Sequence, residues 1–152
     1  MANEEQLERL KRSVEEWNQW REENLDIKID LSSAGLRGAN LERVNLSRAN
    51  LRDAKLSRAC ISHANFSGTD LVFANLSGAD LSHTNLWIAR ALYTNFERTN
   101  LTGACIWDWH INNETNLNHV ICKYIYLGHD YRGYADRRPS ETLQLATTKL
   151  TE

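Results

Sequence analysis

Residues that could support acid–base or metal chemistry are few in this 152-residue chain. Two histidines, His63 and His83, are 20 residues apart, and a second group lies further along: Asp108, His110, His119, His129 and Asp130. No Ser or Cys can be matched with a base and an orienting acid, so we expect no catalytic residues. There is neither a glycine-rich phosphate loop nor zinc-ligand spacing, and we therefore expect no cofactor and no metal.

Three cysteines, Cys60, Cys105 and Cys122, make an odd number, and all three are expected to be free thiols in a reducing cytoplasm. Residues 1–16 are rich in Glu, Lys and Arg, without the apolar core of a secretion signal. No segment approaches the ~20 apolar residues that span a bilayer. The sequence thus predicts a cytoplasmic protein without a membrane segment.

The element that must position these residues is an internal repeat of five residues. An apolar residue recurs at this interval, and we call these positions the centres: Leu31, Leu36, Leu41, Leu46, Leu51, Leu56, Ile61, Phe66, Leu71, Leu76, Leu81, Leu86, Ala91, Phe96, Leu101, Ile106 and Ile111. From Ala34 to Ala104, the residue two positions before each centre is Ala, Thr or Val, and directly before the centre Asn or Asp is common.

Neither a helix nor a continuous strand can use this period. Five residues of helix advance by about 500°, so the centres would spiral around its axis. In a strand, an odd period moves the centres to alternate faces. A square coil of four short segments and four corners keeps every centre inside, and successive coils then stack about 4.8 Å apart. Residues 20 apart become neighbours in one column.

The register shifts by one residue between Asn112 and Glu114, after which the pairs Thr115–Leu117, Val120–Cys122 and Ile125–Leu127 continue the pattern. Twenty centres at four per coil predict about five coils.

Segments such as Ala39-Asn40-Leu41 and Ala79-Asp80-Leu81 match A(D/N)LXX, and the chain therefore resembles the pentapeptide-repeat family over residues 29–127. The resemblance implies an all-β solenoid, a right-handed quadrilateral β-helix. The C-terminal residues are similar to the ends of cyanobacterial members. We divide the chain into an N-terminal capping helix (1–25), the β-helix (26–127) and a C-terminal non-repeat tail (128–152).

Both ends of an open solenoid need covering. Residues 3–24 are predicted to form one helix that begins at Asn3 and either caps the first coil or binds a partner. Gly128 and Gly133, with Tyr131 and Tyr134, are typical of a loop, and Ser140 could begin a short helix. We expect the tail to cover the last coil or run along one side.

Stacking the corners 20 residues apart predicts an apolar patch where other corners carry polar residues. This candidate interaction patch consists of Val72, Phe73, Trp87, Ile88, Leu92, Tyr93 and Trp107. Three interpretations remain open: a homodimer, cover by one of the termini, and an unidentified protein partner.

The same columns bear on the chemistry-bearing residues. His63 and His83 share a column without a third metal ligand. Cys60 and Cys105 precede centres and should point outward, whereas Cys122 is itself a centre and should be buried.

Charge separates the remaining hypotheses. Some members of the family resemble DNA and inhibit a topoisomerase, which requires an acidic rod. Residues 31–127 instead contain nine Lys or Arg and seven Asp or Glu. The basic first coils form either a solvated face or a contact for an acidic protein or nucleic acid. We therefore predict a non-enzymatic protein-interaction scaffold, with a DNA mimic as the alternative and nucleic acid binding disfavoured.

Overall fold

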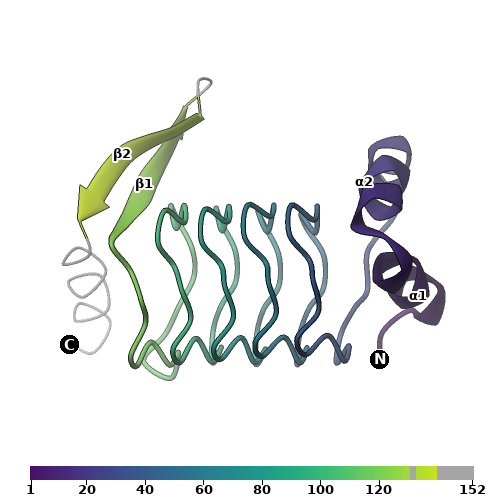
Figure 1. Cartoon of the computed structure of the whole chain (residues 1–152), viewed down its shortest axis with the longest axis horizontal. Coiled ribbons are helices and arrows are strands. Elements are labelled where there is room, and N and C mark those ends of the chain that lie inside the picture. Colours follow the sequence, from purple (N-terminus) through teal and green to yellow (C-terminus); the bar gives the residue numbers. More distant parts are fainter. Residues whose placement is uncertain (131–132, 140–152) are drawn as a thin grey trace.

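The computed structural model describes residues 1–130 and 133–139, and these form a row of stacked coils between two N-terminal helices and a C-terminal hairpin (Figure 1). Successive coils are joined by isolated parallel bridges between residues 20 apart, from Asp30↔Asn50 to Arg90↔His110. The residues that form these bridges each lie directly before a centre, at the position that favours Asn or Asp. The five-residue period therefore closes after four repeats.

Each corner is built by a local pattern of hydrogen bonds. The N–H of Ala34 donates to the carbonyl of Leu31 across the corner, at 3.1 Å. The side chain of Asp30 accepts from the N–H of Ser32 at 3.0 Å, which fixes the entry to the corner. The second corner residue, Ser33, has a positive φ of 58°. The Asn or Asp preference thus has a cause that the repeat pattern alone does not show: these side chains fix the corner that follows.

The centres form a dry interior, in which Leu51, Leu71 and Phe66 have no exposed surface. Thr is accepted in place of Ala because its hydroxyl donates inside the coil. Thr94 Oγ1, for example, lies 2.8 Å from the carbonyl oxygen of Leu71. A buried hydroxyl with a partner avoids the free-energy cost of an unsatisfied polar group.

The one-residue insertion is confirmed. After Arg90↔His110 the bridges join residues 21 apart: Asn95↔Asn116, Asn100↔Ile121 and Cys105↔Tyr126. The ladder therefore resumes in register after residues 112–114.

Two helices precede the coils, α1 (Glu4–Arg12) and α2 (Val14–Glu23), so the prediction of a single helix is wrong at Ser13. Ser13 has extended backbone, with φ −162°, and its hydroxyl accepts from the N–H of Glu16 at 3.2 Å, which starts the second helix. Asn3 does begin the first helix, as predicted. The break gives each helix its own approach to the first coil: Leu10 and Trp17 are both buried.

The segment after the coils is a hairpin of β1 (Tyr124–Asp130) and β2 (Gly133–Pro139), paired antiparallel from Tyr124↔Pro139 to Asp130↔Gly133. The prediction of a loop is therefore wrong at Gly128, Gly133 and Tyr134, which lie in the paired strands, whereas Tyr131 lies outside the described residues. The predicted helix at Ser140 lies outside the described residues. Within the described residues, no helix is long and apolar enough to cross a membrane.

Candidate interaction surface

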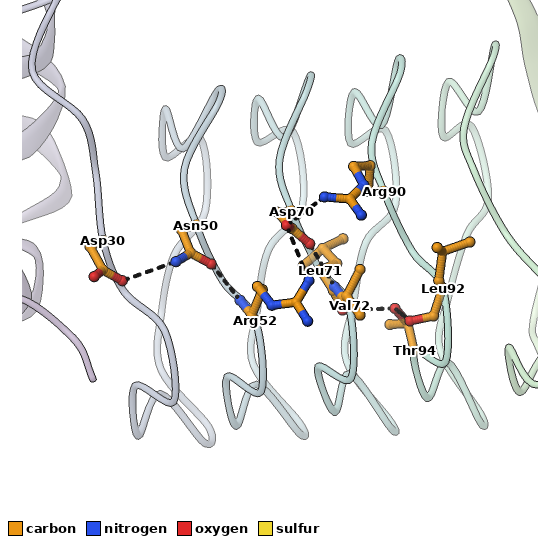
Figure 2. Close-up of polar contacts among 9 residues, drawn as sticks. All are labelled: Asp30, Asn50, Arg52, Asp70, Leu71, Val72, Arg90, Leu92 and Thr94. Carbon is orange, nitrogen blue, oxygen red and sulfur yellow. Dashed lines mark hydrogen bonds and ion pairs between the residues drawn. The ribbon is translucent and has the colours of Figure 1, made fainter.

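One side of the coil carries a column of charged and polar residues that begins Asp30, Asn50, Asp70 and Arg90 (Figure 2). We call this side, with the two corners that border it, the Asp70 face. The carboxylate of Asp70 accepts three hydrogen bonds on this face. Its Oδ1 accepts from the N–H of Val72 at 3.1 Å, and its Oδ2 accepts from Arg90 at 3.0 Å and Arg52 at 3.5 Å.

The two corners that border the Asp70 face carry stacked aromatic pairs. Phe73 and Tyr93 lie with ring centroids 4.8 Å apart and planes 17° from parallel. Trp87 and Trp107 lie 5.9 Å apart at 11°. These four side chains and Ile88 are between 37% and 52% exposed, which is high for large apolar residues. We call these five residues the aromatic corners.

The two other residues of the predicted patch lie deeper. Val72 is only 3% exposed, so its prediction as a surface residue is wrong, and Leu92 is half-buried. Both are first corner residues, as is the buried Ser62, whereas the exposed Phe73 and Tyr93 are second corner residues. At this corner the first residue lies against the coil wall and the second points away from it, whereas the first corner residues Trp87 and Trp107 are exposed.

The backbone conformation of the second corner residues is restricted. Phe73 and Tyr93 have φ of 61° and 58°, close to the values at His63 and Arg58. The N–H of Phe73 donates to the carbonyl of Leu92 in the next coil at 3.2 Å. Positive φ is uncommon for residues of this size, and it persists because ladder hydrogen bonds hold both sides of the corner.

The two stacked histidines, His63 and His83, have ring centroids 4.8 Å apart, with planes 14° from parallel. His83 extends over Gly103, where an added Cβ would lie 2.5 Å from Nδ1 of His83. The glycine thus leaves room for the ring. Within residues 1–130 and 133–139, no group of three His, Cys, Asp or Glu is placed to hold a metal ion.

The three cysteines are free. Cys105 is fully buried although it stands directly before a centre, because the hairpin covers it, with Sγ 4.0 Å from the carbonyl oxygen of Gly128. Burial raises the pKa of the Cys105 thiol. Cys122, expected to be buried, is half-buried because it belongs to the terminal coil, and desolvation also raises its pKa.

Among the basic residues of the first coils, Arg43, Arg48 and Arg58 are exposed second corner residues. Arg52 is directed to Asp70 of the next coil. Sequence reasoning counted Arg52, Asp70 and Arg90 only as charges. Their spacings of 18 and 20 residues would have predicted the contact, because these spacings join neighbouring coils.

Comparison with known proteins places the chain in a class. The family model described as "Pentapeptide repeats (8 copies)" matches residues 29–68 and 49–87. A pentapeptide repeat protein from the Arabidopsis thaliana thylakoid lumen is 22% identical, with 76% of this chain and 75% of that chain covered and a TM-score of 0.61. One from Nostoc PCC 7120 is 28% identical, with 69% and 93% covered and a TM-score of 0.52. One from the cyanobacterium Cyanothece 51142 is 35% identical, with 62% and 60% covered and a TM-score of 0.41.

Residues 29–87 carry the repeats of the pentapeptide-repeat family, and the similarity to solved pentapeptide repeat proteins implies a right-handed quadrilateral β-helix. The comparison with curated proteins gives no match.

Proposed function

We propose that this chain is a non-enzymatic scaffold that binds a protein partner through the aromatic corners of the Asp70 face. The observation that carries the proposal is the exposure of Phe73, Trp87 and Tyr93, at 52%, 37% and 46%, on a rod whose other corners carry mainly polar residues. Exposed groups of large apolar side chains usually mark binding surfaces. Aromatic residues are also enriched at the centres of protein interfaces.

The stacking of these rings supports the proposal energetically. Phe73 and Tyr93 hold each other in place, and their backbone is held by the ladder. Binding then immobilises few additional side-chain torsions, which lowers the entropic cost of association. A rigid ladder of rings can therefore yield affinity from a small area.

The test is capture of partners from extracts of the source cells with immobilised protein. The Phe73→Ser/Tyr93→Ser chain should lose at least tenfold of any partner that the unchanged chain enriches. A matched control is the Arg58→Ser/Arg98→Ser chain, which alters two exposed second corner residues of another column and should retain the partner. Equal capture by all three chains would overturn the proposal.

The charge balance distinguishes this proposal from DNA mimicry. Cations exceed acids by two in residues 31–127, and four exposed arginines lie in the first coils. A mimic of DNA needs the opposite sign over its length. Supercoiling by DNA gyrase should therefore proceed normally in the presence of this protein, and potent inhibition would favour the mimic.

We further propose that α1 and α2 cap the first of about five coils spanning residues 26–127. Supporting contacts are the N–H of Asn3 to the carbonyl of Asp30, at 2.8 Å, and the indole N–H of Trp17 to the carbonyl of Asn45, also at 2.8 Å. Gln6 both donates to Lys28 and accepts from Asp30. Removal of residues 1–24 should lower the melting temperature and promote aggregation; an unchanged monomeric melting curve would contradict a cap.

The three free thiols support a reducing compartment such as the cytoplasm as the site of action. Fractionation of source cells with an antibody against the protein would locate it, and recovery from an oxidising compartment would contradict this part of the proposal.

A further inference from the structure

The Asp70 face repeats itself after one coil with its charge reversed. Asp70, Val72 and Phe73 are followed 20 residues later by Arg90, Leu92 and Tyr93. The two sets occupy equivalent positions in adjacent coils, as the bridge between Asp70 and Arg90 shows. A carboxylate thus corresponds to a guanidinium, one branched aliphatic side chain to another, and one aromatic ring to another.

We propose that the partner of the aromatic corners is a second copy of this chain, placed antiparallel against the Asp70 face. This inference rests on the proposed function and names its partner. The two-fold axis would run across the face, midway between the coils of Asp70 and Arg90. Rotation about it brings Arg90 of one copy opposite Asp70 of the other, and Tyr93 opposite Phe73.

One axis satisfies both kinds of contact. The midpoint of the charged pair and the midpoint of the Phe73–Tyr93 pair differ by three residues along the chain. At a coil spacing of about 4.8 Å per 20 residues, this is a shift of roughly 0.7 Å along the rod. Charge and aromatic contacts therefore favour the same register, as a closed two-fold interface requires.

Charge also selects against the parallel arrangement. A two-fold axis along the rod would keep each coil level with its copy and would place Asp70 against Asp70 and Arg90 against Arg90. Like charges in direct opposition cost free energy, and they suppress wrong pairings at interfaces. The Arg90 side chain is half exposed, at 50%, and only 3.0 Å from Asp70, so its guanidinium can turn toward a second carboxylate without leaving the face.

The Trp87–Trp107 pair would lie beside this contact rather than at its centre. Its midpoint is 17 residues beyond that of the charged pair, or roughly 4 Å along the rod. The interface is then centred on Phe73 and Tyr93, with the tryptophan corner toward one end.

The experiment measures molar mass by light scattering across a concentration series. The unchanged chain should approach twice its 17.5 kDa mass at high concentration. The Asp70→Arg chain and the Arg90→Asp chain, measured separately, should dimerise at least tenfold more weakly, because each then presents like charges to its own copy. An equimolar mixture of the two should dimerise again, because each now meets the opposite charge. Melting curves establish that both chains fold.

A control charge change on another side, Asp80→Arg, should leave the mass unchanged. If the Asp70→Arg chain does not fold, Phe73→Cys and Tyr93→Cys chains on a Cys60→Ser background replace it. A short bis-maleimide should then join the two different chains in a mixture more efficiently than it joins two copies of either.

Three results would overturn the inference: a monomeric mass of the unchanged chain up to millimolar concentration, undiminished dimers of the single charge variants, or failure of their mixture to recover. Loss of extract capture by the Phe73→Ser/Tyr93→Ser chain, together with a monomeric unchanged chain, would leave the proposed function standing with a different protein partner. Failure of both experiments would remove both.

Discussion

The corners at Arg52-Asp53 and Val72-Phe73 are one coil apart and have nearly the same backbone, yet one is charged and the other apolar. The φ angles of Asp53 and Phe73 are 58° and 61°. Their N–H groups donate to the next coil at 3.0 and 3.2 Å. The backbone of the coil therefore does not dictate which side chain occupies a second corner position. Corner chemistry is free to vary, and a local change of chemistry on a constant backbone is therefore informative about binding.

The largest effect is expected from replacing the buried centre residue that precedes each of these two corners. Leu51 directly precedes the charged corner, Leu71 directly precedes the apolar corner, and both leucines are fully buried. Replacing either by Ala should lower the free energy of unfolding by about 2–5 kcal/mol, through lost burial and a residual cavity. Urea unfolding of Leu51→Ala and Leu71→Ala should give similar losses. A loss of unfolding free energy in only one of the two variants would mean that the interiors of the two coils are not equivalent.

The second change separates the two positions of a single corner. Val72→Ser should cost roughly 1–2 kcal/mol, because a buried aliphatic side chain is removed from the wall of the coil. Phe73→Ser should cost less, about 0.5–1 kcal/mol, because the ring is half exposed and loses mainly its stacking on Tyr93. Thermal melting of the two chains measures the order. The reverse order would place the first corner residue, not the second, on the surface.

A smaller effect is expected when Asp70, which precedes the apolar corner, is replaced by the residue type found at the equivalent position before the charged corner. Asp70→Asn reproduces the residue found at Asn50 and keeps an oxygen that can accept from the N–H of Val72. It removes the ion pairs with Arg90 and Arg52, which are 50% and 39% exposed. The loss should be within about 1 kcal/mol and should shrink in high salt. A loss that salt does not reduce would point to the hydrogen bonds rather than to the charge.

The smallest change concerns pH at the start of the same column. The hydrogen bonds from Ser32 lower the pKa of Asp30 below its ordinary value. A depressed carboxyl pKa contributes stability at neutral pH, and this contribution is lost as the pH falls through the folded-state value. Asp30→Asn should therefore reduce the fall in stability between about pH 7 and pH 3. Identical acid dependence of the two chains in urea unfolding would show that Asp30 contributes nothing.

Much of this protein could be read from its sequence, because each repeat is surrounded by copies of itself. The period of five places Leu51 and Leu71 inside, and the insertion before Thr115 restores the register without distant information. The columns also identified Phe73, Tyr93, Trp87 and Trp107 as neighbours. Such predictions succeed where a residue packs against other copies of the same repeat, because the repeat pattern then also specifies the packing partner.

Only the tertiary structure decided the features that break the repeat. The helix divides at Ser13, whose backbone is extended and whose hydroxyl accepts from the N–H of Glu16 at the start of α2. Cys105 is buried because the hairpin, and not another coil, follows it. Val72 is buried although Trp87 and Trp107, at the equivalent position of another corner, are exposed, so burial at the first corner position depends on local packing. These depend on contacts that occur once, and a contact that occurs once leaves no period in the sequence.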